Sequence, residues 1–154
     1  MKREIKFRGQ VLNSVKDKKD NVVTEWKSWV YGDLLHRPNG VLHILTLNEE
    51  KGCYENNIID PETVGQFTGL LDKGGKEIYE GDIINVNGKY PRLVKFINEY
   101  ACFCIARISD LDNNLETGYW QQVIPGWWNN PDREIEVCGN IYDNPELLKG
   151  CSHE

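Results

Sequence analysis

The sequence predicts a mainly β protein built from short antiparallel strands, with one short helix near the C-terminus. Short apolar segments rich in Val, Ile, Tyr, Phe and Trp recur along the chain, as expected for strands. Clusters of Gly, Pro, Asn and Asp separate these segments and predict turns. No long stretch has the apolar period of an amphipathic helix, so strands must supply the core.

The first expected element is a hairpin from Ile5 to Tyr31. The segment Ile5-Lys6-Phe7-Arg8 alternates apolar and basic residues, which is typical of a half-buried strand. A polar, charged loop follows, and the segment from Trp26 to Leu35, rich in Trp, Val and Tyr, predicts a return strand. This strand is expected to stop near Gly32-Asp33.

A turn at Arg37-Pro38-Asn39-Gly40 precedes a further strand, Val41-Leu42-His43-Ile44-Leu45. The apolar pattern breaks again between Asn56 and Pro61. This break is the candidate boundary between an N-terminal β lobe, residues 1–60, and a second lobe, residues 61–154.

In the second lobe, a turn at residues 73–76 and a turn at Glu80-Gly81-Asp82 lead into the strand 83–86. Residues 92–97 and 101–106 then predict a hairpin. Its second strand is apolar on both faces, so it should be central and buried. The acidic segment 109–117 is expected to be an exposed loop.

The last expected strands are residues 121–124 and 134–141. Asn144 and Pro145 then favour the start of a helix that ends near Gly150. The Asn side chain is a good cap, and Pro fits the first helical position.

Four segments together resemble the YopX family, small proteins of bacteriophages and prophages with no assigned biochemical role. They are residues 3–9, the segment Trp29-Val30-Tyr31-Gly32-Asp33-Leu34, the stretch from Thr63 to Val86, and residues 139–148. Where the family has Leu-x-Asp-Lys-Asn-Gly-Lys, this chain has Leu70-Leu71-Asp72-Lys73-Gly74-Gly75-Lys76, which keeps the turn. The resemblance implies an SH3-like barrel for residues 61–154 and a phage or prophage origin. It transfers no catalytic residues.

The composition limits the classes of function. The net charge of the 154 residues is −6, which disfavours broad electrostatic adhesion to DNA or anionic membranes. The N-terminus has no apolar signal segment, and no apolar run approaches a membrane span, so a cytoplasmic protein in a bacterial host is expected. The five cysteines are expected to be reduced thiols.

Two metal sites are conceivable, and each has a simpler structural interpretation. Glu77, Glu80 and Asp82 offer carboxylates, but Gly81 with Asp82 forms a natural structural turn in which Gly81 adopts a positive φ. Cysteines and a histidine offer a zinc set, namely Cys102, Cys104, Cys138, Cys151 and His153. Cys102 and Cys104 have strand spacing inside an apolar run, which favours core packing. No metal or other cofactor is therefore expected.

Two surfaces are candidates for binding. Lys6 and Arg8 with Trp26 and Trp29 have the basic and aromatic character of a nucleic-acid face, although alternation also fits a solvated strand face with the aromatic rings inside. The adjacent Trp127-Trp128 must point in opposite directions if the segment is extended, so one of them is a candidate partner surface.

The preferred function is a non-enzymatic protein-binding or self-associating module, with a homo-oligomer or a host or phage protein as partner. A nucleic-acid-binding accessory protein is the alternative. A metal-dependent enzyme ranks third, because no spacing of acid, base, nucleophile or metal ligand forms a recognisable set.

Overall fold

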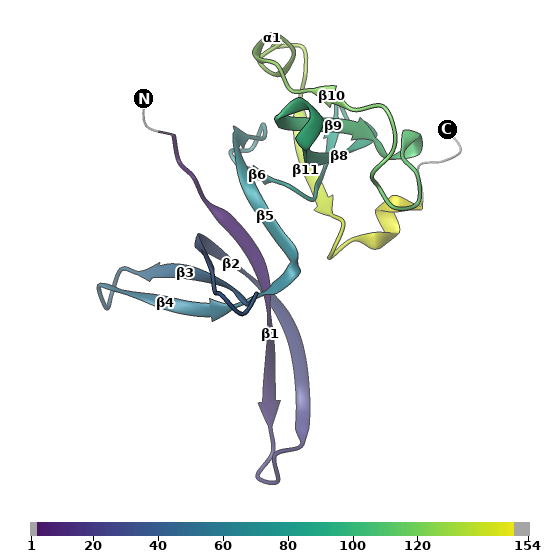
Figure 1. Ribbon diagram of the computed structural model, residues 1–154. Coiled ribbons are helices and arrows are strands. Elements are labelled where there is room, and N and C mark those ends of the chain that lie inside the picture. Colours follow the sequence, from purple (N-terminus) through teal and green to yellow (C-terminus); the bar gives the residue numbers. More distant parts are fainter. Residues whose placement is uncertain (1–2, 150–154) are drawn as a thin grey trace. The chain divides into compact units, whose positions relative to one another are not determined.

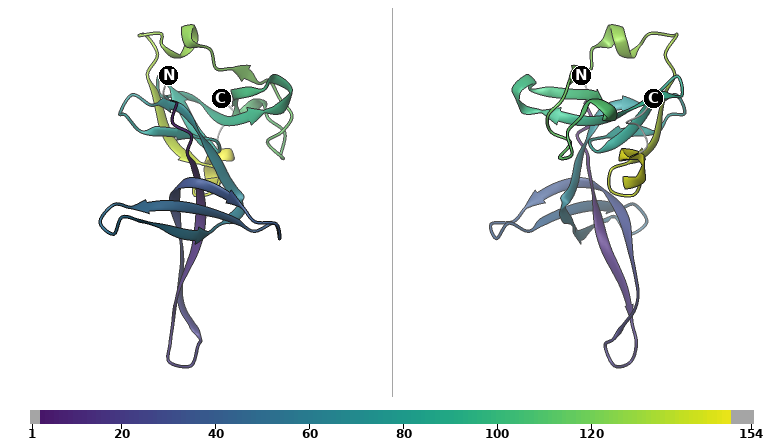
Figure 2. Two further views of the ribbon diagram at one scale, coloured as in Figure 1. Left: turned by 60° about the vertical axis from the view of Figure 1, so that its left-hand side comes forward. Right: turned by 90° about the vertical axis from the view of Figure 1, so that its right-hand side faces the viewer.

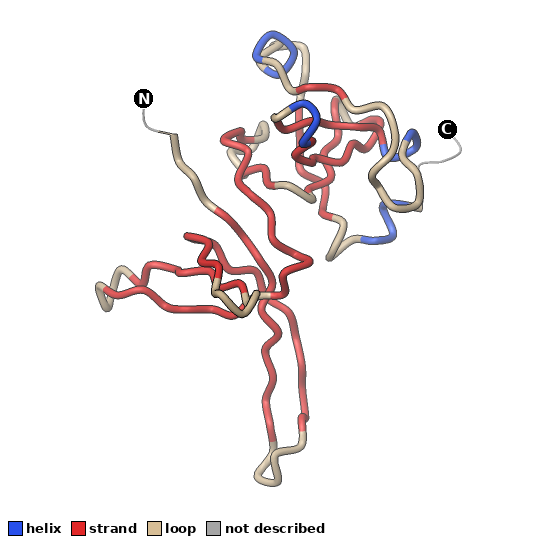
Figure 3. The backbone as a smooth tube through the Cα atoms, in the orientation of Figure 1, coloured by secondary structure: helices blue, strands red, loops and turns tan. Residues whose placement is uncertain are grey.

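The computed structural model describes residues 3–149 and confirms the mainly β class. These residues contain eleven strands, and their helical elements are turns of three or four residues (Figures 1 and 3). The chain divides into two compact units, one ending at Phe67 and the other beginning at Thr68. The sequence placed this boundary at residue 60, where the strand β5 (Asp60–Leu71) instead begins, with Pro61 near its start.

The N-terminal unit is an antiparallel sheet in the order β4-β3-β2-β1-β5. Its strands are β1 (Phe7–Lys16), β2 (Val22–His36), β3 (Leu42–Asn48) and β4 (Cys53–Ile58), together with the first part of β5. The expected first hairpin is confirmed, with Phe7 opposite Gly32 and Lys16 opposite Val22. The strand β4 was not expected from the sequence.

The strand β2 contains the whole predicted segment from Trp26 to Leu35, and it does not stop near Gly32-Asp33 as expected. It changes partner there, from β1 up to Gly32 to β3 from Asp33 onward. Gly32 allows this crossing because a Cβ at that position would lie 2.0 Å from the carbonyl oxygen of Leu45. A glycine at this point therefore joins two pairings instead of ending a strand.

The distal part of the β1–β2 hairpin is a two-stranded ribbon, which we call the arm (residues 11–28). Among the described strands, β5 pairs with β1 only as far as Gln10, and β3 pairs with β2 only from Asp33. Beyond these points no further described strand pairs with the ribbon, which extends away from the rest of its own unit in Figures 1 and 2. The Asp17 side chain closes its tip by accepting hydrogen bonds from the backbone N–H groups of Lys19 (2.8 Å) and Asn21 (3.0 Å).

The C-terminal unit contains an antiparallel sheet in the order β10-β9-β8-β7-β11 and a short hairpin of β5 with β6 (Glu77–Tyr79). The sheet strands are β7 (Asp82–Val86), β8 (Lys89–Ile97), β9 (Cys102–Arg107), β10 (Gln121–Gln122) and β11 (Ile135–Asn140). The expected hairpin of β8 and β9 is confirmed, and β9 lies between two neighbours. The strands β10 and β11 end the sheet, so the expected SH3-like barrel is not closed.

Each face of this sheet carries its own hydrophobic cluster. Ile84, Val94 and Ile105 belong to the first cluster, and their chain neighbours Ile83 and Leu93 belong to the second. Successive side chains of a strand point to opposite faces, so neighbouring residues divide between the clusters. All five of these side chains are fully or almost fully buried.

The segment between β9 and β11 covers both faces of the sheet. Leu111, Leu115 and Trp120 pack on the second cluster, whereas Trp127 and Trp128 pack on the first. The sequence-based prediction of an exposed acidic loop is therefore wrong for the leucines at 111 and 115, which are partly buried. The acidic residues of this segment lie at its exposed turns.

The chain end after β11 differs in detail from the expected helix. Residues Pro145–Leu148 form a short 3-10 helix, η3. The Asn144 side chain does not cap it, because its Oδ1 accepts a hydrogen bond from the backbone N–H of Asn140 (3.2 Å) instead. No helix in the described part of the chain is long and apolar enough to cross a membrane.

Candidate functional site

The turn at Glu80-Gly81-Asp82 has the geometry of a structural connection. Gly81 has a φ of +87°, the positive value expected from the sequence. The Asp82 side chain is 1% exposed, and its Oδ2 accepts a hydrogen bond from the backbone N–H of Tyr79 (2.8 Å). A carboxylate of Glu80 accepts a bond from the N–H of Phe96 (3.3 Å). Glu77, Glu80 and Asp82 are not drawn together, and residues 3–149 contain no group of three metal-ligating side chains.

The neighbouring turn is linked to the last strand of the sheet. Asp72 Oδ1 accepts hydrogen bonds from the N–H groups of Gly74 (2.9 Å) and Lys76 (2.8 Å), and its Oδ2 accepts one from Val137 in β11 (3.1 Å). Partial burial opposes ionisation of this carboxyl, but the three backbone donors outweigh it and lower its pKa. The Asp72 carboxylate thus fastens the turn to β11.

The basic and aromatic residues of the N-terminal unit do not form one exposed face. Arg8 is 4% exposed, and its guanidinium lies over the Trp29 ring at 4.5 Å from the centroid. Lys6 forms an ion pair with Glu4 (3.2 Å). Trp26 lies farther out on the arm, opposite Asn13, and is exposed. Trp26 is thus exposed but lies far along the ribbon from Arg8, whereas Trp29 is partly buried beneath the Arg8 guanidinium.

Of the two cysteines of β9, Cys104 is buried and Cys102 is partly buried. The Sγ atoms of Cys102 and Cys104 are 3.9 Å apart, as strand spacing on one face allows. Desolvation of the buried Cys104, reinforced by its hydrogen bond with Cys102 and the charge of that neighbour, raises the pKa of Cys104 to about 12. Cys138 is exposed, and Cys151 and His153 lie outside the described residues.

The two adjacent tryptophans lie in a helical turn, α1 (Pro125–Trp128), so the expectation of an extended segment with opposed side chains is wrong. Their ring centroids are 6.2 Å apart, and both rings are half-buried against the first cluster. Trp128 also lines an apolar hollow of about 270 Å³ with Phe103 and Ile124. The Pro125 ring starts this turn because its fixed φ suits the first helical position.

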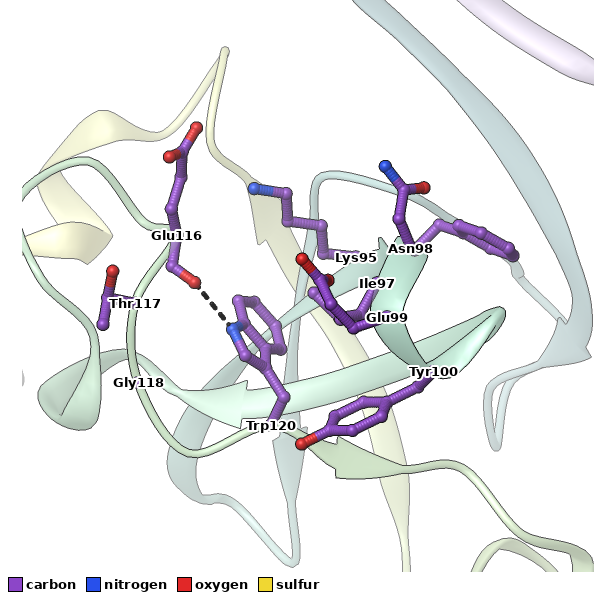
Figure 4. A pocket seen from close by; sticks show the side chains of 10 residues that line it. Lys95, Ile97, Asn98, Glu99, Tyr100, Glu116, Thr117, Gly118 and Trp120 are labelled. Atoms are coloured by element: carbon purple, nitrogen blue, oxygen red, sulfur yellow. Dashed lines mark hydrogen bonds between the residues drawn. The ribbon is translucent and has the colours of Figure 1, made fainter.

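A larger hollow of about 500 Å³ lies beside the link between β8 and β9 (Figure 4). Its wall includes Lys95, Glu99 and Tyr100 from this hairpin, and Trp120 from the following segment. The Trp120 ring is held by a hydrogen bond from its Nε1–H to the carbonyl oxygen of Glu116 (2.9 Å), drawn in Figure 4. This hollow was not foreseen, because its two halves are distant in sequence.

A cluster of three arginines was also missed. Arg92 on β8 lies directly opposite Arg107 on β9, and both Arg92 and Arg133 approach the ring of Trp127. The three residues are far apart in sequence. The strand register pairs Arg92 with Arg107, and the Trp127 ring brings Arg133 close to Arg92. The pairing of Arg92 with Arg107 was implicit in the predicted hairpin of β8 and β9. The approach of Arg133, in the segment before β11, to Trp127 was not.

Comparisons with known proteins identify the family. The profile of the YopX protein family matches residues 15–149. A search among curated proteins found no match. The crystal structure of protein EF1440 from Enterococcus faecalis is similar at a TM-score of 0.43 and 19% identity, over 96% of this chain and 99% of that chain. The family match spans most of the chain and agrees with the resemblance found in its sequence, so the chain belongs to the YopX family.

Proposed function

We propose that this protein is a non-enzymatic binding module that associates with a second protein chain through its arm. The observation that carries the proposal is the set of large apolar side chains exposed on the arm. They are between 48% and 65% exposed and comprise Leu12, Val15, Val22, Val23 and Trp26. The pairing register divides them between the two faces of the ribbon, with Val15 and Trp26 on one face and Leu12 on the other. Several large exposed apolar side chains on one short ribbon favour an interface.

Within the arm, the two strands pair only with each other among the described strands. An isolated two-stranded ribbon is marginally stable in water, and a further layer is usually needed. Trp26 lies opposite Asn13, and Val15 follows Asn13 by two residues, so Val15 and Trp26 share one face of the ribbon. A partner packed on this face would bury both side chains and supply the missing layer.

The partner under this proposal is a second copy of the chain. Closed two-fold dimers are the commonest assemblies of soluble proteins, and they bury the same surface of each copy. The arm carries lysines and acidic residues interspersed, so two copies can approach without a large repulsion. A host or phage protein is the other source of a partner, consistent with the phage or prophage origin that the resemblance implies.

The hollow at Trp128 is a second apolar surface. It keeps Trp127 and Trp128, the partner surface suggested by the sequence, as the second candidate. Ile124 beside it is 53% exposed. It ranks below the arm because both tryptophan rings already pack on the core of their own unit.

Sedimentation velocity at tens of micromolar protein tests the proposal, since modest interfaces become populated in that range. The parent should be a dimer, and the double variant Val15→Thr, Trp26→Thr should be a folded monomer. The variant Ile124→Thr is the matched control for loss of an exposed apolar side chain, and it should remain a dimer. A monomeric parent ends the proposal of self-association. Dissociation by Ile124→Thr alone would move the contact to the tryptophan surface.

A further inference from the structure

We propose that Arg92, Arg107 and Arg133 form a binding site for a phosphate group in the C-terminal unit. This inference is independent of the arm and its partner. The phosphate comes either as a free ion or as a phosphodiester of single-stranded nucleic acid.

The strand register sets two of the guanidinium groups side by side. Arg92 and Arg107 are direct cross-strand partners, so their side chains leave the same face of the sheet. The guanidinium of Arg107 lies over the Tyr90 ring at 4.3 Å from the centroid. Stacking on an aromatic ring fixes the plane of a guanidinium and leaves the N–H groups at its edge free of the ring.

The third arginine joins through Trp127. The guanidinium carbon of Arg133 lies 4.6 Å from the centroid of the Trp127 ring, and that of Arg92 lies 5.8 Å from it. An Nη1 of Arg133 donates a hydrogen bond to the carbonyl oxygen of Trp127 (2.8 Å), which holds the side chain in place. One tryptophan ring thus brings two cations together.

No ion pair among the described residues compensates the charges of the cluster. Within residues 3–149, none of the three arginines has an ion pair, although the whole chain has a net charge of −6. The Nη1 of Arg92 is buried and has no hydrogen-bond partner among the described residues. Burial, and then the positive charges of Arg107 and Arg133, lower the pKa of Arg92. Like charges directly opposite each other destabilise a sheet, so the native chain keeps a repulsion that an anion would remove.

A hollow of about 200 Å³ beside the cluster provides room for the anion. Arg92 and Arg107 line it together with Tyr119 and Gln121, both of which carry hydrogen-bond donors. Arg133 is not part of this wall and contributes its charge from beside Trp127. Asp110 also lies at its wall, but this carboxylate has no ion pair with a described arginine. The hollow therefore presents more donors and positive charge than negative charge.

The donor set favours phosphate over a carboxylate or a chloride ion. A guanidinium matches the oxygen spacing of phosphate with two parallel hydrogen bonds, and a phosphate dianion offers enough oxygens for several arginines. The rings of Tyr90, Tyr119 and Trp127 lie at or near the same place, and aromatic rings next to arginines are used to stack the bases of single strands. A nucleotide-borne phosphate therefore fits the surroundings of the cluster.

Calorimetry and thermal unfolding in sodium phosphate, against sodium chloride at equal ionic strength, test the site. Phosphate well above its Kd should raise Tm by about 2–4 °C. Arg107→Gln should weaken phosphate binding by about tenfold or more, because it removes a charged donor. Arg37→Gln, the same substitution at an exposed turn of the other unit, should leave binding unchanged. Equal Tm in both salts, or unchanged binding by Arg107→Gln, would overturn the proposal.

The variant Arg107→Glu separates a binding role from a structural role. It places a carboxylate opposite Arg92, so Tm without phosphate should rise or stay level while the response to phosphate disappears. If Arg107 serves only to stack on Tyr90, the same variant should lower Tm and leave the phosphate response intact. That second result also rejects the site.

Fluorescence anisotropy with a labelled oligothymidine strand distinguishes the two sources of phosphate. Binding that Arg107→Gln weakens about tenfold, and that falls with added salt, assigns a nucleic-acid phosphodiester. Binding of inorganic phosphate without binding of the strand assigns a free phosphate ion and excludes nucleic acid. Failure of both probes rejects the site altogether.

Discussion

The substitution Gly81→Ala tests whether the signature turn depends on glycine for two separate reasons. The first is backbone conformation, because a φ of +87° is left-handed and costs an L-residue about 1–2 kcal/mol. The second is space, because a Cβ at Gly81 would lie 3.0 Å from Cε2 of Tyr142. Moving that ring adds roughly 1 kcal/mol, at the low end of overpacking costs. Gly81→Ala should therefore lower the free energy of unfolding by about 2–3 kcal/mol.

Two other glycines isolate the contact with Tyr142. Gly75 and Gly40 each have a φ of +84°, and nothing lies within 4 Å of a Cβ built on either. Gly75→Ala and Gly40→Ala should each cost only the conformational part, about 1–2 kcal/mol. Urea unfolding followed by tryptophan fluorescence measures all three variants. If Gly81→Ala costs no more than Gly75→Ala, the contact with Tyr142 does not matter and this account of the turn is refuted.

Three further predictions concern single residues. Gly32→Ala should destabilise the N-terminal unit by more than roughly 3 kcal/mol, the scale of severe core defects, because the new Cβ meets the carbonyl of Leu45. Hydrogen exchange at β2 and β3 measures this loss, and unchanged protection of those strands would contradict the prediction. The pKa of Asp72 is below its ordinary 3.8, so its contribution to stability is complete above that pH and is lost as the pH falls through the lower folded value. Asp72→Asn should remove that part of the acid dependence in urea titrations, and a parent-like pH profile would argue against it. In the native protein at about pH 8, iodoacetamide should alkylate the exposed Cys53 but not the buried Cys104, whose pKa is about 12. Mass spectrometry measures the labelling of each cysteine, and equal labelling of the two would show that β9 opens readily.

The elements that the sequence predicted well are those with local patterns. The hairpin of β8 and β9 has apolar strands on both sides of a short polar link, and its register is set within that link. The positive φ of Gly81 was foreseeable because a glycine between Glu and Asp, just before an apolar strand, is typical of a tight turn. Local chemistry was sufficient in both cases.

The elements that were missed depend on distant partners. The strand β4 is polar, with Asn56 and Asn57 at its centre, and it is a strand because β3 supplies a pairing edge. β2 passes through Gly32 because Leu45 of β3 approaches closely there. No pattern along the chain contains that information, since propensity in strands is decided by neighbours.

The candidate sites were missed for the same reason. The arginine cluster combines residues from β8, from the end of β9 and from the segment before β11, so no sequence window contains it. Trp127 and Trp128 were singled out from the sequence as a candidate partner surface, but their helical turn, which packs against the first cluster, was not predicted. The exposure of Val22, Val23 and Trp26 on the arm could not be predicted, because the sequence does not show that no further strand pairs with the ribbon there.

The pairing of β1 with β5 has a consequence for how the chain folds during synthesis. The β1–β2 and β3–β4 hairpins close through short loops, and such hairpins form in about 1–10 μs. The other edge of β1 must wait for residues that are made much later, since the N–H of Gln10 bonds to the hydroxyl of Thr63, 53 positions along the chain. The β1–β2 pairing is complete at Gly32, 31 residues before Thr63, and at about 5–20 residues per second a ribosome needs roughly 2–6 s to supply those residues. For that interval the nascent hairpin exposes an unpaired strand edge, which is the state most open to pairing with another nascent chain.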